Sequence, residues 1–146
     1  EKGVYSLINL FSRLKLKHKL TIAGDSNFVG ANDENIQFLN EITDKKKIIE
    51  LYDAHNIFIL PSYTEGAPKV ILESLVRKIP VIIFKEIKHV KLNFKGIFVC
   101  DRNILSLEKN IKFIIKNYNK IQLEMKKNNL PTKKNFQKKL LKIVNA

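Results

Sequence analysis

The sequence predicts an α/β fold, a doubly wound domain built on one mostly parallel sheet. Short continuous apolar segments alternate with amphipathic ones along the 146 residues, a pattern typical of parallel strands covered by helices on both faces. No apolar segment approaches the roughly 20 residues that span a bilayer. Because no repeat and no Gly/Ser-rich or Pro-rich linker divides the chain, we expect a single domain over residues 1–146.

The expected elements follow from hydrophobic periodicity and from turn residues. Strands are expected over residues 19–23, 36–39, 57–60, 80–84 and 96–100. Helices are expected over residues 4–14, 45–54, 68–77, 105–118 and 133–144. Asp44 can cap the second helix, and Pro68 suits the first position of the third, where its missing N–H has no intrahelical partner. Residues 24–32 and 85–95 are expected to be loops.

The net charge of +13 is carried almost entirely by lysine, because Arg13, Arg77 and Arg102 are the only arginines. Nucleic-acid recognition favours arginine, so a nucleic-acid partner is not expected. Two interpretations remain, a solvated lysine-rich surface and a patch that contacts an anionic membrane. The second has most support in residues 119–146, a basic segment expected to be helical.

Cys100 is the only cysteine, so an intrachain disulfide is impossible, as expected for a protein of the reducing cytoplasm. It follows an apolar segment and is interpreted as a buried small hydrophobic residue rather than a nucleophile. The chain begins Glu1-Lys2-Gly3, without an initiator methionine or a signal-peptide pattern. We therefore expect a cytoplasmic fragment of a longer protein.

The loop after residues 57–60 carries the strongest functional signal, because such sheets bind ligands at the carboxyl ends of their strands. Gly66 permits close backbone approach, and the helix beginning near Pro68 offers unpaired N–H groups and a positive dipole end to a phosphate. Glu65 and Glu73 stand on either side of this helix start. A carboxylate accepts two hydroxyl donors, so the pair suits two sets of diols. A nucleotide-sugar, with phosphate between two polyols, would use all these parts.

The same segment resembles a family motif. Residues 65–73 read Glu-Gly-Ala-Pro-Lys-Val-Ile-Leu-Glu, which is similar to the Glu-x7-Glu motif of retaining glycosyltransferases of the GT-B fold, family four. A Pro-Ser pair at 61–62 precedes the motif, a Pro-Val pair at 80–81 follows it, and the Lys-Gly pair at 2–3 resembles the one that opens the family's C-terminal, donor-binding domain. The resemblance runs from residue 2 to about residue 118. It implies a Rossmann-like domain that forms one half of a GT-B enzyme.

This resemblance implies that Glu65 contacts the hydroxyls of the donor sugar or the reacting centre, which makes it the candidate catalytic residue. Backbone groups of the next five residues would lie near the sugar and the diphosphate. The glycine turn comes first, and the first-turn N–H groups of the helix follow it. These donor-binding candidates are Gly66, Ala67, Pro68, Lys69 and Val70.

Four further donor-binding residues are implied by the same resemblance. Glu73 would hold the ribose hydroxyls, and Lys2 would neutralise charge on the diphosphate. Ile42 falls where the family usually cradles the base, and Gly24 would line the floor of the pocket.

The family implies transfer of a sugar from a UDP- or GDP-linked donor to an acceptor hydroxyl, with retention, as in a hexosyltransferase of polysaccharide, lipopolysaccharide or glycolipid synthesis. No acidic metal-binding cluster is visible, and no metal or other cofactor is expected. The expected partners are the donor, the protein's own N-terminal acceptor-binding domain and the inner face of an anionic membrane. Without that acceptor domain, the isolated chain is expected to transfer sugar weakly or not at all.

Two alternatives remain open. One is another sugar-nucleotide enzyme of the same fold, such as an epimerase or a phosphorylase. The other is a non-catalytic basic binding domain. The sequence also departs from the family at Lys78, where a helix-ending glycine is usual, and in residues 85–95, which lack the usual glycine-and-acid pattern.

Overall fold

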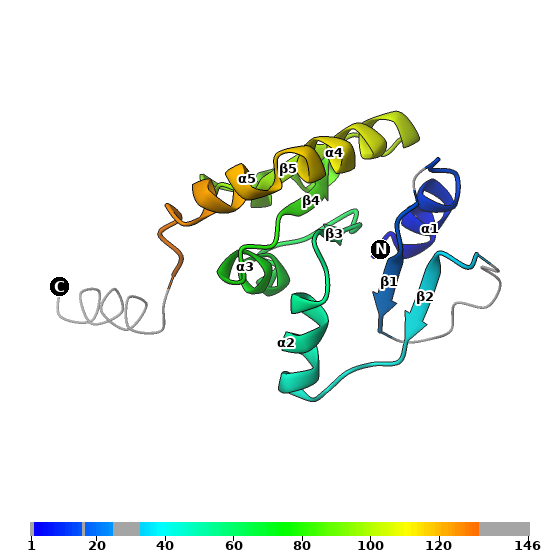
Figure 1. Ribbon diagram of the computed structural model, residues 1–146, viewed down its shortest axis with the longest axis horizontal. Helices are drawn as coiled ribbons and strands as arrows, with labels where there is room; N and C mark the ends of the chain where they lie inside the picture. The colour runs from blue at the N-terminus through cyan, green and yellow to red at the C-terminus, as the bar shows by residue number, and fades with distance from the viewer. Residues whose placement is uncertain (1, 16, 25–32, 132–146) are drawn as a thin grey trace.

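The computed structural model describes residues 2–15, 17–24 and 33–131 (Figure 1). Its helices are α1 (Val4–Ser12), α2 (Lys45–Asp53), α3 (Lys69–Val76), the 3₁₀ segment η1 (Lys85–Lys91), α4 (Ile104–Lys116) and α5 (Tyr118–Met125). Its strands are β1 (Leu20–Ala23), β2 (Ile36–Leu39), β3 (Phe58–Leu60), β4 (Val81–Phe84) and β5 (Ile97–Cys100). The helix expected over 133–144 lies outside the described residues, as does most of the loop expected over 24–32.

The strands pair in two parallel ladders among the described residues. β1 pairs with β2, and β4 lies between β3 and β5. The alternation of strands and helices and the parallel pairing confirm the predicted α/β fold. The expectation of one continuous sheet is met only in part, because the two ladders are not hydrogen-bonded to each other in the described part of the chain.

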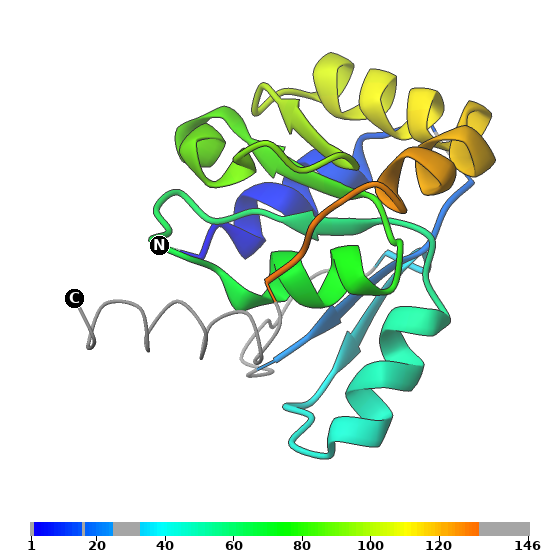
Figure 2. The same ribbon diagram turned by 90° about the vertical axis from the view of Figure 1, so that its left-hand side faces the viewer.

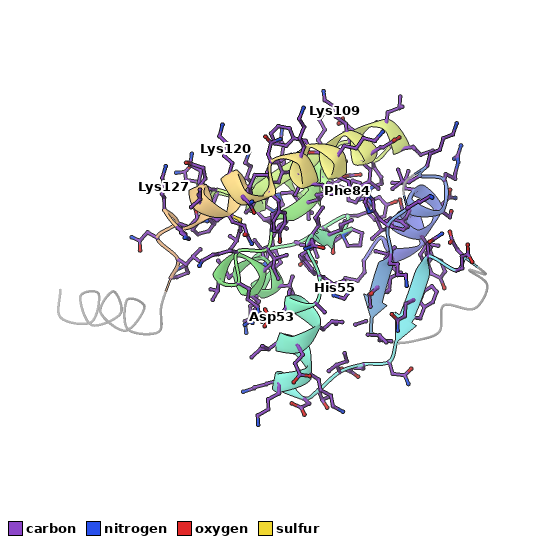
Figure 3. The ribbon with its side chains drawn as sticks, viewed as in Figure 1. Asp53, His55, Phe84, Lys109, Lys120 and Lys127 are labelled. Carbon is purple, nitrogen blue, oxygen red and sulfur yellow. The ribbon has the colours of Figure 1, made fainter. Side chains whose placement is uncertain are left out.

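The core is centred on β4, whose four residues are all fully buried. α3 packs against β4 and α4 against β5, and Leu75, Leu107 and Ile114 fill the space between helices and strands. Figure 3 shows Phe84, the last residue of β4, within the body of the molecule. Continuous apolar sequence at β4 therefore reflects burial on both faces of the strand.

His55, which lies between α2 and β3, connects α2 to β1 through its side chain. Its Nδ1 lies 2.6 Å from the carbonyl oxygen of Leu51, and its Nε2 lies 2.7 Å from Oγ1 of Thr21 on β1. The imidazole is half-buried, and no metal-ligating neighbours accompany it in the described residues. His55 therefore joins α2 to β1 and has a structural role.

Three expectations about helices are wrong in detail. Pro68 is the N-cap of α3, with ψ of 112°, and the helix begins one residue later at Lys69. Residues 85–91 of the expected loop form η1, two short 3₁₀ turns that meet at a kink at Ile87, where Ile87 and Val90 are buried. The helix expected to end at residue 118 ends at Lys116.

A separate helix, α5, covers residues 118–125, at the start of the segment 119–146 that was expected to be helical, although no helix with these bounds was expected. The break before it falls at Asn117, whose side-chain amide donates to the carbonyl oxygen of Phe113. α5 then buries Ile121 and Met125 against the core. Asn128 also bonds to the backbone of Lys95, so the chain remains attached to the domain after α5 ends.

Lys78 adopts the left-handed conformation, with φ of 58°, at the position where the family usually has glycine. The turn is held by bonds from Lys78 N to Leu75 O and from Ile79 N to Ser74 O. The buried Ser74 hydroxyl also donates to the carbonyl oxygen of Ile79. These bonds offset the strain that a residue with a Cβ atom experiences in this conformation.

Candidate functional site

The candidate site lies at the carboxyl ends of the strands. Figure 2 shows the N-terminus of the chain beside the turn that follows β3 and leads into α3. Because the strands are parallel, the ends of β3, β4 and β5 meet at this edge. The last paired residues of the strands at this edge are Leu60 with Ile83 and Phe84 with Cys100.

Glu65 is fixed in this turn by two hydrogen bonds to the same carboxylate oxygen. The hydroxyl of Ser62 donates to Oε1 at 2.6 Å, and Nζ of Lys2 donates to it at 3.1 Å. The Glu65 side chain is 14% exposed, whereas that of Lys2 is 76% exposed. The bond from Ser62, with a smaller contribution from Lys2, holds the pKa of Glu65 below its usual value. Among the described residues, both of these bonds go to Oε1 and none reaches the second oxygen, Oε2.

The Lys-Gly pair reaches Glu65 because Gly3 packs against the Pro61 carbonyl. Gly3 has φ of 67°, and a Cβ atom at this position would lie 1.9 Å from the carbonyl oxygen of Pro61. Only glycine fits here without displacing the turn. The structure thus brings together Lys2 and Glu65, two of the donor-binding candidates, although they are far apart in the sequence.

The N-terminus of α3 lies directly after Glu65 and has no side-chain cap. The backbone N–H groups of Lys69 and Val70 belong to the first turn, where a helix has no internal acceptors to offer. Gly66 and Ala67 are exposed and no atom lies within 4 Å of the position of a Cβ on Gly66. This turn therefore has room for a phosphate, and the positive end of the α3 dipole lies beside it.

Glu73 lies further along α3 and is exposed. Its Oε2 accepts a hydrogen bond of 3.3 Å from the hydroxyl of Tyr52 on α2. Burial, followed by the nearby Glu73 carboxylate, raises the pKa of Tyr52, so the tyrosine remains a hydrogen-bond donor. One turn later, Arg77 forms a bidentate ion pair with Asp53 of α2 (Figure 3 labels Asp53). These two contacts fix α2 beside α3.

Gly24 and Ile42 lie on the other ladder. Gly24 follows β1 and donates from its backbone N–H to the carbonyl oxygen of Leu39, and Ile42 is half-buried between β2 and α2. Among the described residues, no hydrogen bond connects either of them to Glu65 or Glu73. Their roles in holding the base and lining the pocket remain predictions.

Sequence reasoning assigned no site role to four residues that hold the turn around Glu65, namely Ser62, Glu86, His89 and Arg102. His89 and Glu86 come from η1, the segment expected to be a loop, and Arg102 follows β5. Nε2 of His89 lies 2.8 Å from the carbonyl oxygen of Glu65. The position of Arg102 directly after a strand, at the edge where ligands bind, was the available signal.

In the described ranges 2–15, 17–24 and 33–131, no group of three His, Cys, Asp or Glu residues could hold a metal ion. Cys100 is fully buried, and burial raises the pKa of its thiol, as expected for a core residue rather than a nucleophile. Within the same ranges no helix has the length and apolar character needed to cross a bilayer.

The fold and this site together define the chain as a Rossmann-like domain of the glycosyltransferase class. It belongs to the glycosyl transferases group 1 family, whose model matches residues 1–130. It is 28% identical over 82 residues to TuaC of Bacillus subtilis (strain 168), provisionally named a teichuronic acid biosynthesis glycosyltransferase. That match covers 56% of this chain and 21% of TuaC. An uncharacterized glycosyltransferase of Haemophilus influenzae is 26% identical over 133 residues, which are 80% of this chain and 36% of the relative.

A solved structure shows the same fold. The crystal structure of HepE from Anabaena in complex with UDP-glucose superposes with a TM-score of 0.64 at 19% identity, covering 85% of this chain and 38% of HepE. Sucrose-phosphate synthase from Thermosynechococcus elongatus superposes with a TM-score of 0.68 at 17% identity, covering 86% of this chain and 36% of the synthase. The chain thus spans well under half the length of the relatives it matches.

Proposed function

We propose that this chain is the donor-binding domain of a retaining glycosyltransferase of family four and that it binds a UDP- or GDP-linked sugar. The observation that carries the proposal is the arrangement of Glu65, which Ser62 and Lys2 hold beside the uncapped N-terminus of α3. The first-turn amides and Lys2 would bind the diphosphate, and Glu65 would accept hydroxyls of the sugar. Glu73, with Tyr52 beside it, would hold the ribose.

The chemical demand of the transfer is stabilisation of the departing diphosphate. Lys2 and the helix N-terminus would supply that positive charge, without a resident metal. A carboxylate whose pKa is lowered takes up a proton poorly, so Glu65 suits hydroxyl binding better than general-base catalysis. The acceptor would bind to a separate N-terminal domain, and the TuaC match favours a role in polysaccharide synthesis.

Calorimetry with UDP, GDP and ADP tests the donor site. We expect UDP or GDP to bind, and Glu73→Ala to weaken binding by more than about 1 kcal/mol through loss of a charged hydrogen bond. Glu50→Ala, which removes an exposed glutamate elsewhere on α2, is the matched control and should bind as the unchanged chain does. Absence of binding by all three nucleotides would contradict the proposal.

A peripheral contact with an anionic membrane is a second proposal, favoured by one surface. α4 and α5 follow one edge of the molecule, and Figure 3 shows Lys109, Lys120 and Lys127 along it. Between residues 104 and 127 the sequence has six lysines and two glutamates. The exposed apolar side chains Leu105 and Leu123 lie on the same two helices. Lysines beside exposed leucines suit the interface of an anionic bilayer.

Vesicle co-sedimentation tests this surface. The chain should sediment with vesicles containing phosphatidylglycerol, less so at higher salt, and not with phosphatidylcholine alone. Replacing Lys109, Lys116 and Lys120 by glutamate should abolish sedimentation. The control replaces Lys45, Lys46 and Lys47 on α2, which changes the net charge equally. If both triple variants lose binding equally, the chain responds to net charge and the α4–α5 surface is not the contact.

A further inference from the structure

Arg102 is the most extensively bonded charged residue near the candidate site. Its Nε donates to Oε1 of Glu86 at 2.7 Å. The two terminal nitrogens donate to two successive backbone carbonyls, at 3.0 Å to Pro61 and 3.2 Å to Ser62. All three guanidinium nitrogens are therefore engaged, and two of them bond to the turn that precedes Glu65.

The guanidinium is also enclosed by aromatic rings. Its central carbon lies 3.9 Å from the ring centroid of Tyr63 and 4.1 Å from that of Phe84. The Arg102 side chain is 12% exposed. A planar cation held close to two rings has little freedom to rotate, so it holds the carbonyls of Pro61 and Ser62 in one orientation.

We propose that Arg102 is a positioning residue for Glu65. By fixing the backbone of Pro61 and Ser62, it aims the Ser62 hydroxyl at the Glu65 carboxylate, which orients that carboxylate toward the donor sugar. The sugar part of this proposal rests on the proposed function. Its chain of contacts, from Arg102 through Ser62 to Glu65, stands on the structure alone.

A second contact supports the same turn from η1. Nε2 of His89 lies 2.8 Å from the backbone oxygen of Glu65. Since a carbonyl oxygen only accepts, Nε2 carries the proton and donates. η1 thus contributes Glu86 to hold Arg102 and His89 to hold Glu65. The segment that lacks the family's usual glycine-and-acid pattern holds the turn in this way instead.

Arg102→Lys is the sharpest test, because it keeps the charge and removes the planar fork. Nuclear magnetic resonance titration of the Glu65 carboxyl carbon reads the position of Glu65 without any ligand. We expect Arg102→Lys to move the pKa of Glu65 up toward its usual value. Arg13→Lys, at the exposed end of α1, should leave that pKa unchanged.

A double-mutant cycle separates positioning from a general loss of stability. Ser62→Ala removes the hydroxyl through which Arg102 is proposed to act, and it should raise the pKa of Glu65 by itself. Adding Arg102→Lys to Ser62→Ala should then change that pKa no further. If the two shifts add, Arg102 acts on Glu65 by another route and the proposal is wrong. Ser62→Ala also provides a measurable variant if Arg102→Lys fails to fold.

The second readout compares each nucleotide with its glucose conjugate, using UDP, GDP and ADP beside UDP-glucose, GDP-glucose and ADP-glucose. Arg102→Lys should lower the binding affinity for the sugar nucleotide by roughly tenfold more than the affinity for the free nucleotide. This is the loss expected for one charged hydrogen bond. Equal weakening of both would overturn a sugar-directed role. If the unchanged chain binds none of these ligands, the proposed function fails, and the titration still decides whether Arg102 positions Glu65.

Discussion

The two ladders of the domain differ in how deeply they are buried. In the three-stranded ladder all four residues of β4 are fully buried, and α3 and α4 each bury three residues against it. In the two-stranded ladder β1 and β2 each bury a single residue, and α2 buries none. The residues around Glu65 lie at the edge of the first ladder, whereas Gly24 and Ile42 lie at the edge of the second.

Because of this difference in burial, one side of the candidate site is more firmly preorganised than the other. The side that would bind phosphate and sugar is fixed by the core beneath it, by Arg102 and by Gly3 against Pro61. The side expected to cradle the base rests on a ladder that is packed less tightly. We therefore expect the three-stranded ladder to control the stability of the domain.

The largest expected effect comes from one substitution made in both ladders. Ile82→Ala in β4 removes a fully buried side chain and should lower the free energy of unfolding by roughly 2–5 kcal/mol. Ile22→Ala in β1 removes a half-buried one and should cost less than about 2 kcal/mol, because water reaches part of the site. Urea denaturation of both variants measures the difference. Equal losses would show that the ladders contribute alike.

A smaller effect is expected at the contact between the N-terminus and the turn. Gly3→Ala places a Cβ atom 1.9 Å from the carbonyl oxygen of Pro61 and strains a left-handed residue. It should cost roughly 1–3 kcal/mol of unfolding free energy. In Gly66→Ala, the new Cβ meets no described atom within 4 Å, so the loss in thermal denaturation should be below about 0.5 kcal/mol. A larger loss of stability in Gly66→Ala than in Gly3→Ala would mean that Gly3 does not contact the Pro61 carbonyl in solution.

The smallest expected effect is a dependence of stability on pH. Ser62 lowers the pKa of Glu65, and Arg102 lowers that of Glu86, both from an ordinary value of 4.5. Their contribution to stability is therefore complete above about pH 4.5 and is lost as pH falls through the lowered values. In Glu86→Gln, the free energy of unfolding should fall less steeply as the pH is lowered from about 5 to about 3. Urea denaturation at these pH values measures the difference. An unchanged pH slope in the variant would contradict the contribution of Glu86.

Most of the fold could be predicted from the sequence, because each strand of the described chain is a short apolar segment bounded by turn residues. The strand over 36–39 agrees with β2 at both ends, and Asp44 caps α2 through a bond to Lys46 N. The 3₁₀ segment was missed because Ile87 and Val90 are separated by lysine and histidine, a pattern that resembles a polar loop. Residues 119–146 were expected to be helical, but the bounds of α5 were not predicted, because its polar residues obscure the buried pair Ile121 and Met125.

Of the candidate site, too, one part could be predicted from the sequence and another could not. The family motif singled out Lys2 and Glu65 as donor-binding residues, and the structure places them in one ion pair, while their roles toward a donor remain predictions. Arg102 was not assigned, because two of its three bonded nitrogens donate to backbone carbonyls, which any residue offers. A sequence pattern reveals side-chain types, whereas the partner of Arg102 is a turn brought to it by the order of β3, β4 and β5.

The side-chain link at His55 has a consequence for local opening. Backbone hydrogen bonds continue from β3 to β5, whereas β1 is joined to α2 by side chains, among them the imidazole between Thr21 and Leu51. Separating β1 and β2 from the rest therefore breaks side-chain contacts and leaves the β4 ladder intact. The amide hydrogens of β1 and β2 will exchange with solvent through such partial openings, while those of β4 exchange only when the whole domain unfolds.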